Sequence, residues 1–310
     1  MNISVIIPNY NGEELLRRNL PKVFDELNSY KSGKTEVIII DDKSSDGSIT
    51  FLNDFSKTHH DFKLIINEKN IGFAPTANKG VKASSGEIAI LLNTDVYPEK
   101  DFLTPLLKHF INEKMFAVGC LDRSVENGEV VLRGRGLGEW KRGFLLHQRG
   151  EVNKTSTLWV SGGSGAFRKS IWDKLGGFNE LYAPFYYEDI DLSYRALKSG
   201  YHILFEPKSI VVHEHEKGAI KTKYTPFAIK TIAYRNQFIF AWENATDYSL
   251  QFASCFWLPF HLIRALVAFD WAFYLGFFEA LILLPKIIKS SFKAQKLFIL
   301  SDREVIEELA

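Results

Sequence analysis

The first 120 residues alternate short apolar runs with helical patterns, and this alternation restricts the possible fold more than any other feature. Strands that are apolar on both faces and separated by helices form a mostly parallel sheet covered on both sides. The predicted strands are Ile3–Ile7, Glu36–Ile40, Lys63–Ile66, Ile88–Leu92 and Phe116–Gly119. The predicted helices are about Glu13–Tyr30, Ser48–His59, Pro75–Ser84 and Glu99–Asn112. Ligands bind such sheets beyond the carboxyl ends of the strands.

Polar clusters follow two of these strands, at the edge where a ligand is expected. Asp41 and Asp42 follow the strand EVIII, where they can accept hydrogen bonds from a base N–H or a ribose hydroxyl, or cap the next helix. Asn93, Thr94 and Asp95 follow the strand EIAILL. A carboxylate there can bind a divalent cation that bridges a diphosphate, or it can belong to an ordinary turn.

An acidic cluster opens a predicted helix in the second half of the chain. Glu188, Asp189 and Asp191 lie in one first turn, which suits the positive end of a helix dipole. Asp191 also precedes Arg195 by four residues, a spacing that permits an ion pair within the helix. The aromatic residues Phe185–Tyr187 before the cluster would raise the pKa of a carboxylate, as a general base requires. The cluster is therefore either a helix start or the site of a base.

Two further segments offer contacts to a ligand. His213 and His215 end the strand SIVV and share one face, so both imidazoles can approach one metal ion, although a histidine at a strand end is often only a polar boundary residue. The glycine-rich run 162–165 lets backbone amides approach an acceptor or a phosphate, or it forms a tight turn.

The order of these segments along the chain resembles glycosyltransferase family 2. The segments that carry the resemblance are VIIPNYN, DDKSSDGS, NIGFAPTANKG, NTD, SGGSGAFRKSIWDKLGGFNE and YEDIDLSYRALKSG, over roughly residues 1–215. Within the family, the sequence is most similar to the rhamnosyltransferase-like branch that acts on cell-surface polysaccharides. The resemblance implies a GT-A fold, a Rossmann-like α/β domain with a mostly parallel mixed sheet, in residues 1–223.

The resemblance also implies roles for individual residues. Asp189 would be the catalytic base, and Asp95 with His213 would bind Mn²⁺ or Mg²⁺. The nucleotide-sugar site is expected to contain Pro8, Asn9, Tyr10, Asp41, Asp42, Ser44, Asn70, Gly72, Asn78, Asn93 and Thr94. The acceptor site is expected to contain Gly163, Glu188 and Trp159.

The sequence departs from the family pattern at two places. The metal motif begins with Asn93 where the family has Asp, which puts its metal affinity in doubt. The Q-x-x-R-W signature of processive synthases is missing, and Tyr234–Gln237 is the nearest polar cluster. A polymerising synthase with its own pore is therefore disfavoured.

The middle and the C-terminal third have a different character. Residues 123–157 are rich in Gly, Arg and Lys without a clear period, which predicts a long irregular excursion over the site. The next segment, from Trp159 to about His215, is predicted to contain two strands, around Ile203 and Val211. Residues 224–310 are predicted as a helical extension, and the end of the chain has a Ser301/Glu304 capping box.

The extension contains a long apolar segment. Residues 248–263 carry no Asp, Glu, Lys or Arg, which falls short of the ~20 residues that span a bilayer. The aromatic-rich stretch WLPFHLIRALVAFDWAFYLGFF overlaps this segment and is followed by Lys286, Lys289, Lys293 and Lys296, a pattern typical of helices that lie in a membrane interface. The alternative is a helical region that packs on the catalytic domain or on a second subunit of a homodimer.

Charge and cysteine content limit the partners and the compartment. A net charge of +1 argues against a nucleic-acid partner, since such proteins usually have a basic excess. Two distant cysteines and a short N-terminal apolar run favour the cytoplasm, with the inner face of the plasma membrane as the site if the interface interpretation holds.

Together these features predict a metal-dependent inverting glycosyltransferase, hexosyl- or rhamnosyltransferase-like. Its donor would be a UDP- or dTDP-sugar, and its acceptor a saccharide or a polyprenyl-diphosphate-linked saccharide in cell-surface polysaccharide synthesis. A sugar-1-phosphate nucleotidyltransferase is disfavoured, because the first turn, PNYNGEELL, has too few glycines for a phosphate loop. The other alternative is a non-catalytic nucleotide-sugar-binding or membrane scaffold protein.

Overall fold

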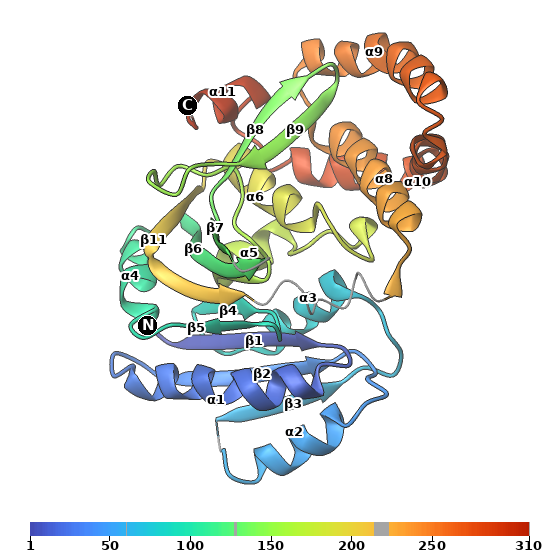
Figure 1. The fold of residues 1–310 in the computed structure, drawn as a ribbon. Coiled ribbons are helices and arrows are strands. Elements are labelled where there is room, and N and C mark those ends of the chain that lie inside the picture. The colour runs from blue at the N-terminus through green and yellow to red at the C-terminus, as the bar shows by residue number, and fades with distance from the viewer. Residues whose placement is uncertain (60, 127–128, 214–222, 310) are drawn as a thin grey trace.

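The computed structural model describes residues 1–59, 61–126, 129–213 and 223–309, which form an α/β fold around one mixed sheet (Figure 1). The strand order is β3-β2-β1-β4-β10-β6-β11-β5, and β7 pairs with β6. Neighbouring pairs among β3, β2, β1 and β4 are parallel, whereas β10 is antiparallel to both β4 and β6. The predicted α/β class with a helical C-terminal region is confirmed.

The strands of the large sheet are β1 (Ile3–Asn9), β2 (Thr35–Asp41), β3 (Phe62–Ile66), β4 (Ile88–Leu92), β5 (Val96–Pro98), β6 (Met115–Glu126), β7 (Glu129–Arg133), β10 (Ser164–Arg168) and β11 (His202–His213). A separate hairpin pairs β8 (Gly136–Lys141) with β9 (Phe144–Arg149). The helices are α1 (Glu13–Ser29), α2 (Ser48–Ser56), α3 (Phe73–Ala83), α4 (Leu103–Leu107), α5 (Lys169–Leu175), α6 (Glu188–Lys198), α8 (Pro226–Asn244), α9 (Tyr248–Val267), α10 (Trp271–Gln295) and α11 (Asp302–Glu307). Two 3₁₀ turns are η1 (Lys108–Ile111) and η2 (Glu180–Tyr182).

The helix predicted at Glu99–Asn112 is shorter than expected. It consists of α4, which begins at Leu103, and of η1. Asp101 has a φ of 62°, a left-handed conformation that an α-helix excludes, so the helix begins only after it.

The prediction of an irregular excursion over residues 123–157 is wrong. The segment contains the end of β6, all of β7 and the β8–β9 hairpin. Its glycines serve close packing: a Cβ at Gly136 would lie 2.1 Å from the Trp159 ring, and one at Gly138 would lie 2.3 Å from Leu158. The glycine content therefore reflects close contacts within regular structure.

The two strands predicted around Ile203 and Val211 are one strand, β11. Its register with β6 shifts between Glu206 and Ile210. Pro207 lies within this interval and has no N–H to donate to the sheet, so the pairing is interrupted there without ending the strand.

The C-terminal helices share a hydrophobic core with the sheet domain. α10 packs along α8 so closely that a Cβ at Gly276 would lie 2.7 Å from the Thr231 carbonyl oxygen. α9 is different, because only Ala265 of its 20 residues is buried. By length and composition both α9 and α10 could cross a membrane, contrary to the expectation from the uncharged run alone, because their apolar windows tolerate single charged residues.

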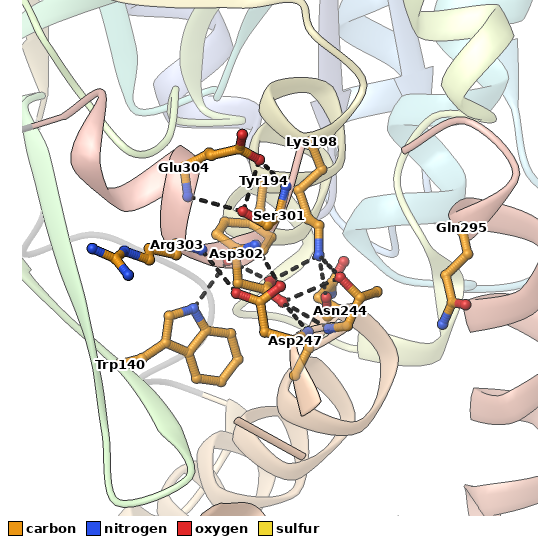
Figure 2. A network of polar contacts seen from close by, with 12 residues as sticks. Trp140, Tyr194, Lys198, Asn244, Asp247, Gln295, Ser301, Asp302, Arg303 and Glu304 are labelled. Atoms are coloured by element: carbon orange, nitrogen blue, oxygen red, sulfur yellow. Dashed lines mark hydrogen bonds and ion pairs between the residues drawn. The ribbon is translucent and has the colours of Figure 1, made fainter. Parts of the chain in front are cut away.

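A buried polar network anchors the end of the chain (Figure 2). The predicted Ser301/Glu304 capping box is present at the start of α11. The Lys198 ammonium donates to Asp302 at 2.8 Å, and both side chains are fully buried. Tyr194 also donates to Asp302, at 2.7 Å, and the backbone N–H groups of Thr246 and Asp247 donate to its second oxygen. Burial opposes the charge of Asp302, but Lys198 outweighs it and lowers the pKa of that carboxyl.

Replacing Asp302 by Ala is expected to lower the free energy of unfolding by ~3–5 kcal/mol, because the charge of Lys198 is left buried without its partner. Urea denaturation measures the change. Arg303→Ala, which removes only an exposed pair with Glu307, serves as the control and should leave the midpoint unchanged. Equal stability of the two variants would mean that the network contributes nothing specific.

Candidate active site

The polar residues predicted from strand ends gather at one edge of the sheet. β1, β2 and β4 are parallel, so the residues after their carboxyl ends share this edge. β10 runs the opposite way and begins there, and β11 ends there beside the start of β5. The predicted site residues along this edge are Asn9, Tyr10, Asp41, Asp42, Asn93, Thr94, Asp95, Gly163 and His213.

Asp41 forms a pre-organised corner with Asn9 and Ser44. Its fully buried carboxylate accepts a hydrogen bond from Asn9 Nδ2 at 2.7 Å and another from the Ser44 N–H at 2.8 Å. Pro8 and Tyr10, on either side of Asn9, are half-buried. The ammonium of Lys223 lies 4.8 Å from the centre of the Tyr10 ring, which adds a positive charge to this corner.

Asp42 holds the adjacent loop in place. Its two oxygens accept from the N–H groups of Ile71 and Gly72, at 2.9 and 2.8 Å, and from Asn67 Nδ2 at 2.9 Å. Gly72 has a φ of 90°, which favours glycine, and α3 begins directly after it. Asn70, in the same loop, is exposed. Asp42 therefore acts on the site through the shape of the loop.

Asn78 and Thr94 are also tied to the surrounding structure. The Asn78 amide exchanges two hydrogen bonds with the backbone of Phe178, both 2.9 Å long, and so joins α3 to the loop after α5. The carbonyl oxygen of Thr94 accepts from Asn19 Nδ2 at 2.9 Å.

Asp95 and His213 face each other across the end of the sheet. Asp95 Oδ2 lies 3.4 Å from His213 Nε2, a separation that fits two ligands of one ion at about 2.1 Å each. The described residues contain no group of three or more His, Cys, Asp or Glu side chains able to hold a metal, so this pair would need further ligands from a bound diphosphate or water. His215, its predicted companion, lies outside the described residues.

Asp122 completes this arrangement and was not predicted. Its Oδ2 lies 2.8 Å from His213 Nδ1, the ring nitrogen that faces away from Asp95. Burial lowers the pKa of His213, but the hydrogen bonds and charges of Asp122 and Asp95 outweigh it and raise that pKa to about 9. A carboxylate behind a histidine is the usual support of a histidine metal ligand. The contact between Asp122 and His213 arises from the pairing of β6 with β11, so the local sequence gives no sign of it.

Asn93 packs against the start of β10. Its N–H donates to the Gly163 carbonyl oxygen at 3.0 Å, and a Cβ at Gly163 would lie 2.5 Å from the Asn93 amide nitrogen. Gly163 is thus required by the close approach of Asn93.

Asp189 lies in the first turn of α6, at the same edge. Its oxygens accept from the N–H groups of Ile190, at 2.8 Å, and of Gly162, at 3.4 Å. Burial raises its pKa, and these two N–H groups oppose the rise. Burial, with the charge of Asp189, also raises the pKa of the neighbouring Glu188. Glu188 Oε2 is buried without a hydrogen-bond partner in the described structure.

The turn before Asp189 is held by contacts from α8. The sequence predicted a helical C-terminal region but not these contacts. Tyr186 and Tyr187 both have left-handed backbones, with φ of 71° and 76°. Asn236 Nδ2 lies 2.8–2.9 Å from the carbonyl oxygens of Tyr182, Phe185 and Tyr186. The Y-R-N-Q cluster that replaces the processive signature was the available signal, and its neighbour Arg235 donates to the carbonyl oxygen of Ala183.

Aromatic side chains cover the site beside Asp189. His147, on β9, packs edge-on against Trp159 and Tyr187, with ring centres 5.7 and 5.3 Å apart. The tip of the same hairpin contacts α9, where Ser254 Oγ donates to the Gly143 carbonyl oxygen at 3.0 Å (Figure 1). The hairpin therefore connects the predicted acceptor residue Trp159 with α9.

Comparisons with known proteins identify the fold and the family. The family model "Glycosyl transferase family 2" matches residues 4–176. The chain is 27% identical over 217 residues to the probable glycosyltransferase YdaM of Bacillus subtilis. This match covers 67% of this chain and 49% of the relative. It is 28% identical over 209 residues to the poly-beta-1,6-N-acetyl-D-glucosamine synthase of Staphylococcus epidermidis, over 67% of this chain and 48% of the relative. The chain thus spans about half the length of these relatives.

Among solved structures, GalNAc-T7 with UDP, GalNAc and Mn²⁺ superposes with a TM-score of 0.65 at 19% identity. The match covers 80% of this chain and 49% of that one. The predicted GT-A fold is confirmed.

Replacing Asn236 by Asp should lower the free energy of unfolding by about 2–3 kcal/mol, because a carboxylate would face three carbonyl oxygens that now receive an amide donor. Thermal and urea unfolding measure the loss. The matched control is Gln237→Glu on the same helix, because the Gln237 side chain makes no hydrogen bond to another described residue. If both variants unfold alike, Asn236 does not hold the turn.

Proposed function

Because the chain belongs to glycosyl transferase family 2, we propose that it is a metal-dependent inverting glycosyltransferase with a nucleoside-diphosphate-sugar donor. The observation that carries the proposal is the shared sheet edge. A carboxylate of raised pKa, Asp189, lies at this edge together with the Asp95–His213 pair and the Asp41 corner.

The Asp41 corner would receive the base and ribose of the donor. Asn9 and Ser44 orient the Asp41 carboxylate, and Pro8 and Tyr10 offer apolar surface for a base. Uracil and thymine present the same N3–H between two carbonyls, so UDP- and dTDP-sugars both fit this chemistry. Of the solved neighbours, GalNAc-T7 was crystallised with UDP.

Asp95 and His213 would hold Mn²⁺ or Mg²⁺ at the diphosphate. The ion would supply positive charge that stabilises the departing nucleoside diphosphate. Asp122 fixes the His213 ring so that Nε2 faces Asp95. Asn93, engaged with Gly163, takes no evident part in this pair.

Asp189 would act as the general base. The acceptor hydroxyl oxygen attacks the anomeric carbon, its proton passes to Asp189, and the bond from that carbon to the diphosphate oxygen breaks. One displacement inverts the anomeric configuration. Burial of Asp189 favours the proton transfer, because it makes the carboxylate a stronger base.

The acceptor would lie between Asp189 and the hairpin. Trp159 offers an aromatic face, and the unpartnered Glu188 Oε2 offers a buried acceptor for a sugar hydroxyl. We assign the acceptor to the class of saccharides or polyprenyl-diphosphate-linked saccharides of cell-surface polysaccharide synthesis, with hexosyl or rhamnosyl transfer. The exposed apolar α9 and α10 support a location at the inner face of the plasma membrane.

The alternative is a non-catalytic nucleotide-sugar-binding or membrane scaffold protein. The pre-formed Asp189 environment favours an enzyme. Release of nucleoside diphosphate from UDP-, dTDP- and GDP-sugars distinguishes the two, and a thermal-shift screen over the same donors identifies the base, since a ligand that binds the native state raises the melting temperature.

Asp189→Asn keeps the size of the side chain but cannot take up the proton. Transfer should fall by ~10²–10⁴-fold, while donor affinity changes little because the base contacts the acceptor. Single-turnover rates and donor titration measure the two quantities separately. Near-normal transfer by this variant would remove Asp189 from its role.

Asp122→Asn is expected to weaken Mn²⁺ binding by about 10–100-fold, because the His213 ring loses its carboxylate partner. Calorimetric titration with Mn²⁺ in the presence of UDP measures the affinity without turnover. Asp95→Ala should abolish the binding, and the surface variant Asp173→Asn should leave it unchanged. If Asp95→Ala binds Mn²⁺ normally, or if excess chelator leaves transfer intact, the ion is not held at this pair.

A further inference from the structure

An open basic cavity lies between the second half of α10 and the loop that contains Asn179 and Leu181. Its volume is about 740 Å³, within the ~300–1,000 Å³ typical of ligand pockets. Lys286, Lys289, Lys293 and Lys296 line it, together with Asn179 and Phe292. Steps of three, four and three residues put the four ammonium groups on one side of the helix.

The four lysines have no anionic partner in the described parts of the chain. Like charges at these spacings repel one another, so the cluster is unfavourable unless an anion lies among them. All four side chains are exposed.

The cavity continues an exposed apolar stripe on α10. The opposite face of the helix is buried, with Gly276 against α8. Steps of three or four residues along the outer face give Trp271, Leu275, Phe278, Ile282, Pro285, Lys289, Phe292 and Lys296, in that order. The exposed face of α10 is therefore apolar in its first half. In its second half it carries lysines and one aromatic side chain, Phe292.

We propose that this face binds a bilayer, with the lysine cavity holding the phosphate groups of anionic phospholipids. Apolar side chains that precede a set of lysines fit the acyl region and the headgroup layer of one leaflet. The apolar α9, in which only Ala265 is fully buried, extends the surface that would contact lipid. This inference goes beyond the proposed reaction, and vesicle binding measured without donor tests it separately.

The test is flotation of the full chain with vesicles of phosphatidylcholine, with and without phosphatidylglycerol. Replacing the four lysines by Gln should weaken binding to the anionic vesicles by about 10²–10³-fold, from roughly five-fold per lysine. Phe278→Ser with Ile282→Ser should weaken binding to both kinds of vesicle. A control variant with Gln at Lys31, Lys34, Lys57 and Lys82, all exposed in the N-terminal part, makes the same change in net charge and should bind normally.

Four outcomes would overturn the proposal. Equal losses in the cavity and control variants would mean that net charge alone acts. Normal flotation of the cavity variant would remove the lysines from the contact. A stable oligomer that dissociates in the cavity variant, or a large thermal stabilisation by inorganic pyrophosphate without vesicles, would assign the face to a second copy of the chain or to a soluble anion. Unfolding curves of the two lysine variants should match the wild type, because every substituted lysine is exposed.

Discussion

The position of the candidate base depends on the hydrogen bonds and the ion pair that the buried carboxylate of Asp191 makes. This carboxylate accepts from Arg195 Nε at 2.8 Å within α6, and from Asn244 Nδ2 at 2.9 Å on α8. Both charged side chains are almost fully buried, so neither can be removed without leaving the other unpaired. Since Asp189 lies two residues away on α6, α8 helps to fix the position of the candidate base.

The same network joins the C-terminal helix α8 to the residues that precede α6. Glu243 of α8 accepts from Asn179 and Tyr182, which precede the turn into α6. Burial, together with the charge of Asp191, raises the pKa of Glu243 to about 8. Polar groups of α8 are thus directed into the sheet domain, while α9 and one face of α10 expose apolar residues. Two chemically opposite surfaces coexist in one helical region.

The sequence alone predicted what short-range patterns determine. The strand β4 (IAILL) is apolar throughout and is fully buried, and Asp191 and Arg195, whose spacing permits an ion pair, form one. Long-range contacts were not predictable in this way. Nothing near Asp122 marks it as the partner of His213, because the contact exists only through the pairing of β6 with β11. The glycines of residues 123–157 do not indicate irregular structure, since close packing within regular strands gives the same composition.

The β8–β9 hairpin sets the distance between α9 and the aromatic side chains beside Asp189. Its tip lies on α9, where the Arg142 carbonyl oxygen is 2.9 Å from His261 Nε2, and the guanidinium of Arg142 lies 4.7 Å from the Phe260 ring centre. His147, which touches Trp159, is three residues along β9 from Phe144, so about 10 Å from the tip at 3.3 Å per residue. The hairpin is thus a spacer between the aromatic wall of the site and whatever surface α9 rests on. On the proposed membrane location, an acceptor anchored in the bilayer would have to span at least this distance to reach Trp159, so the length of the hairpin would set a minimum length for the substrate.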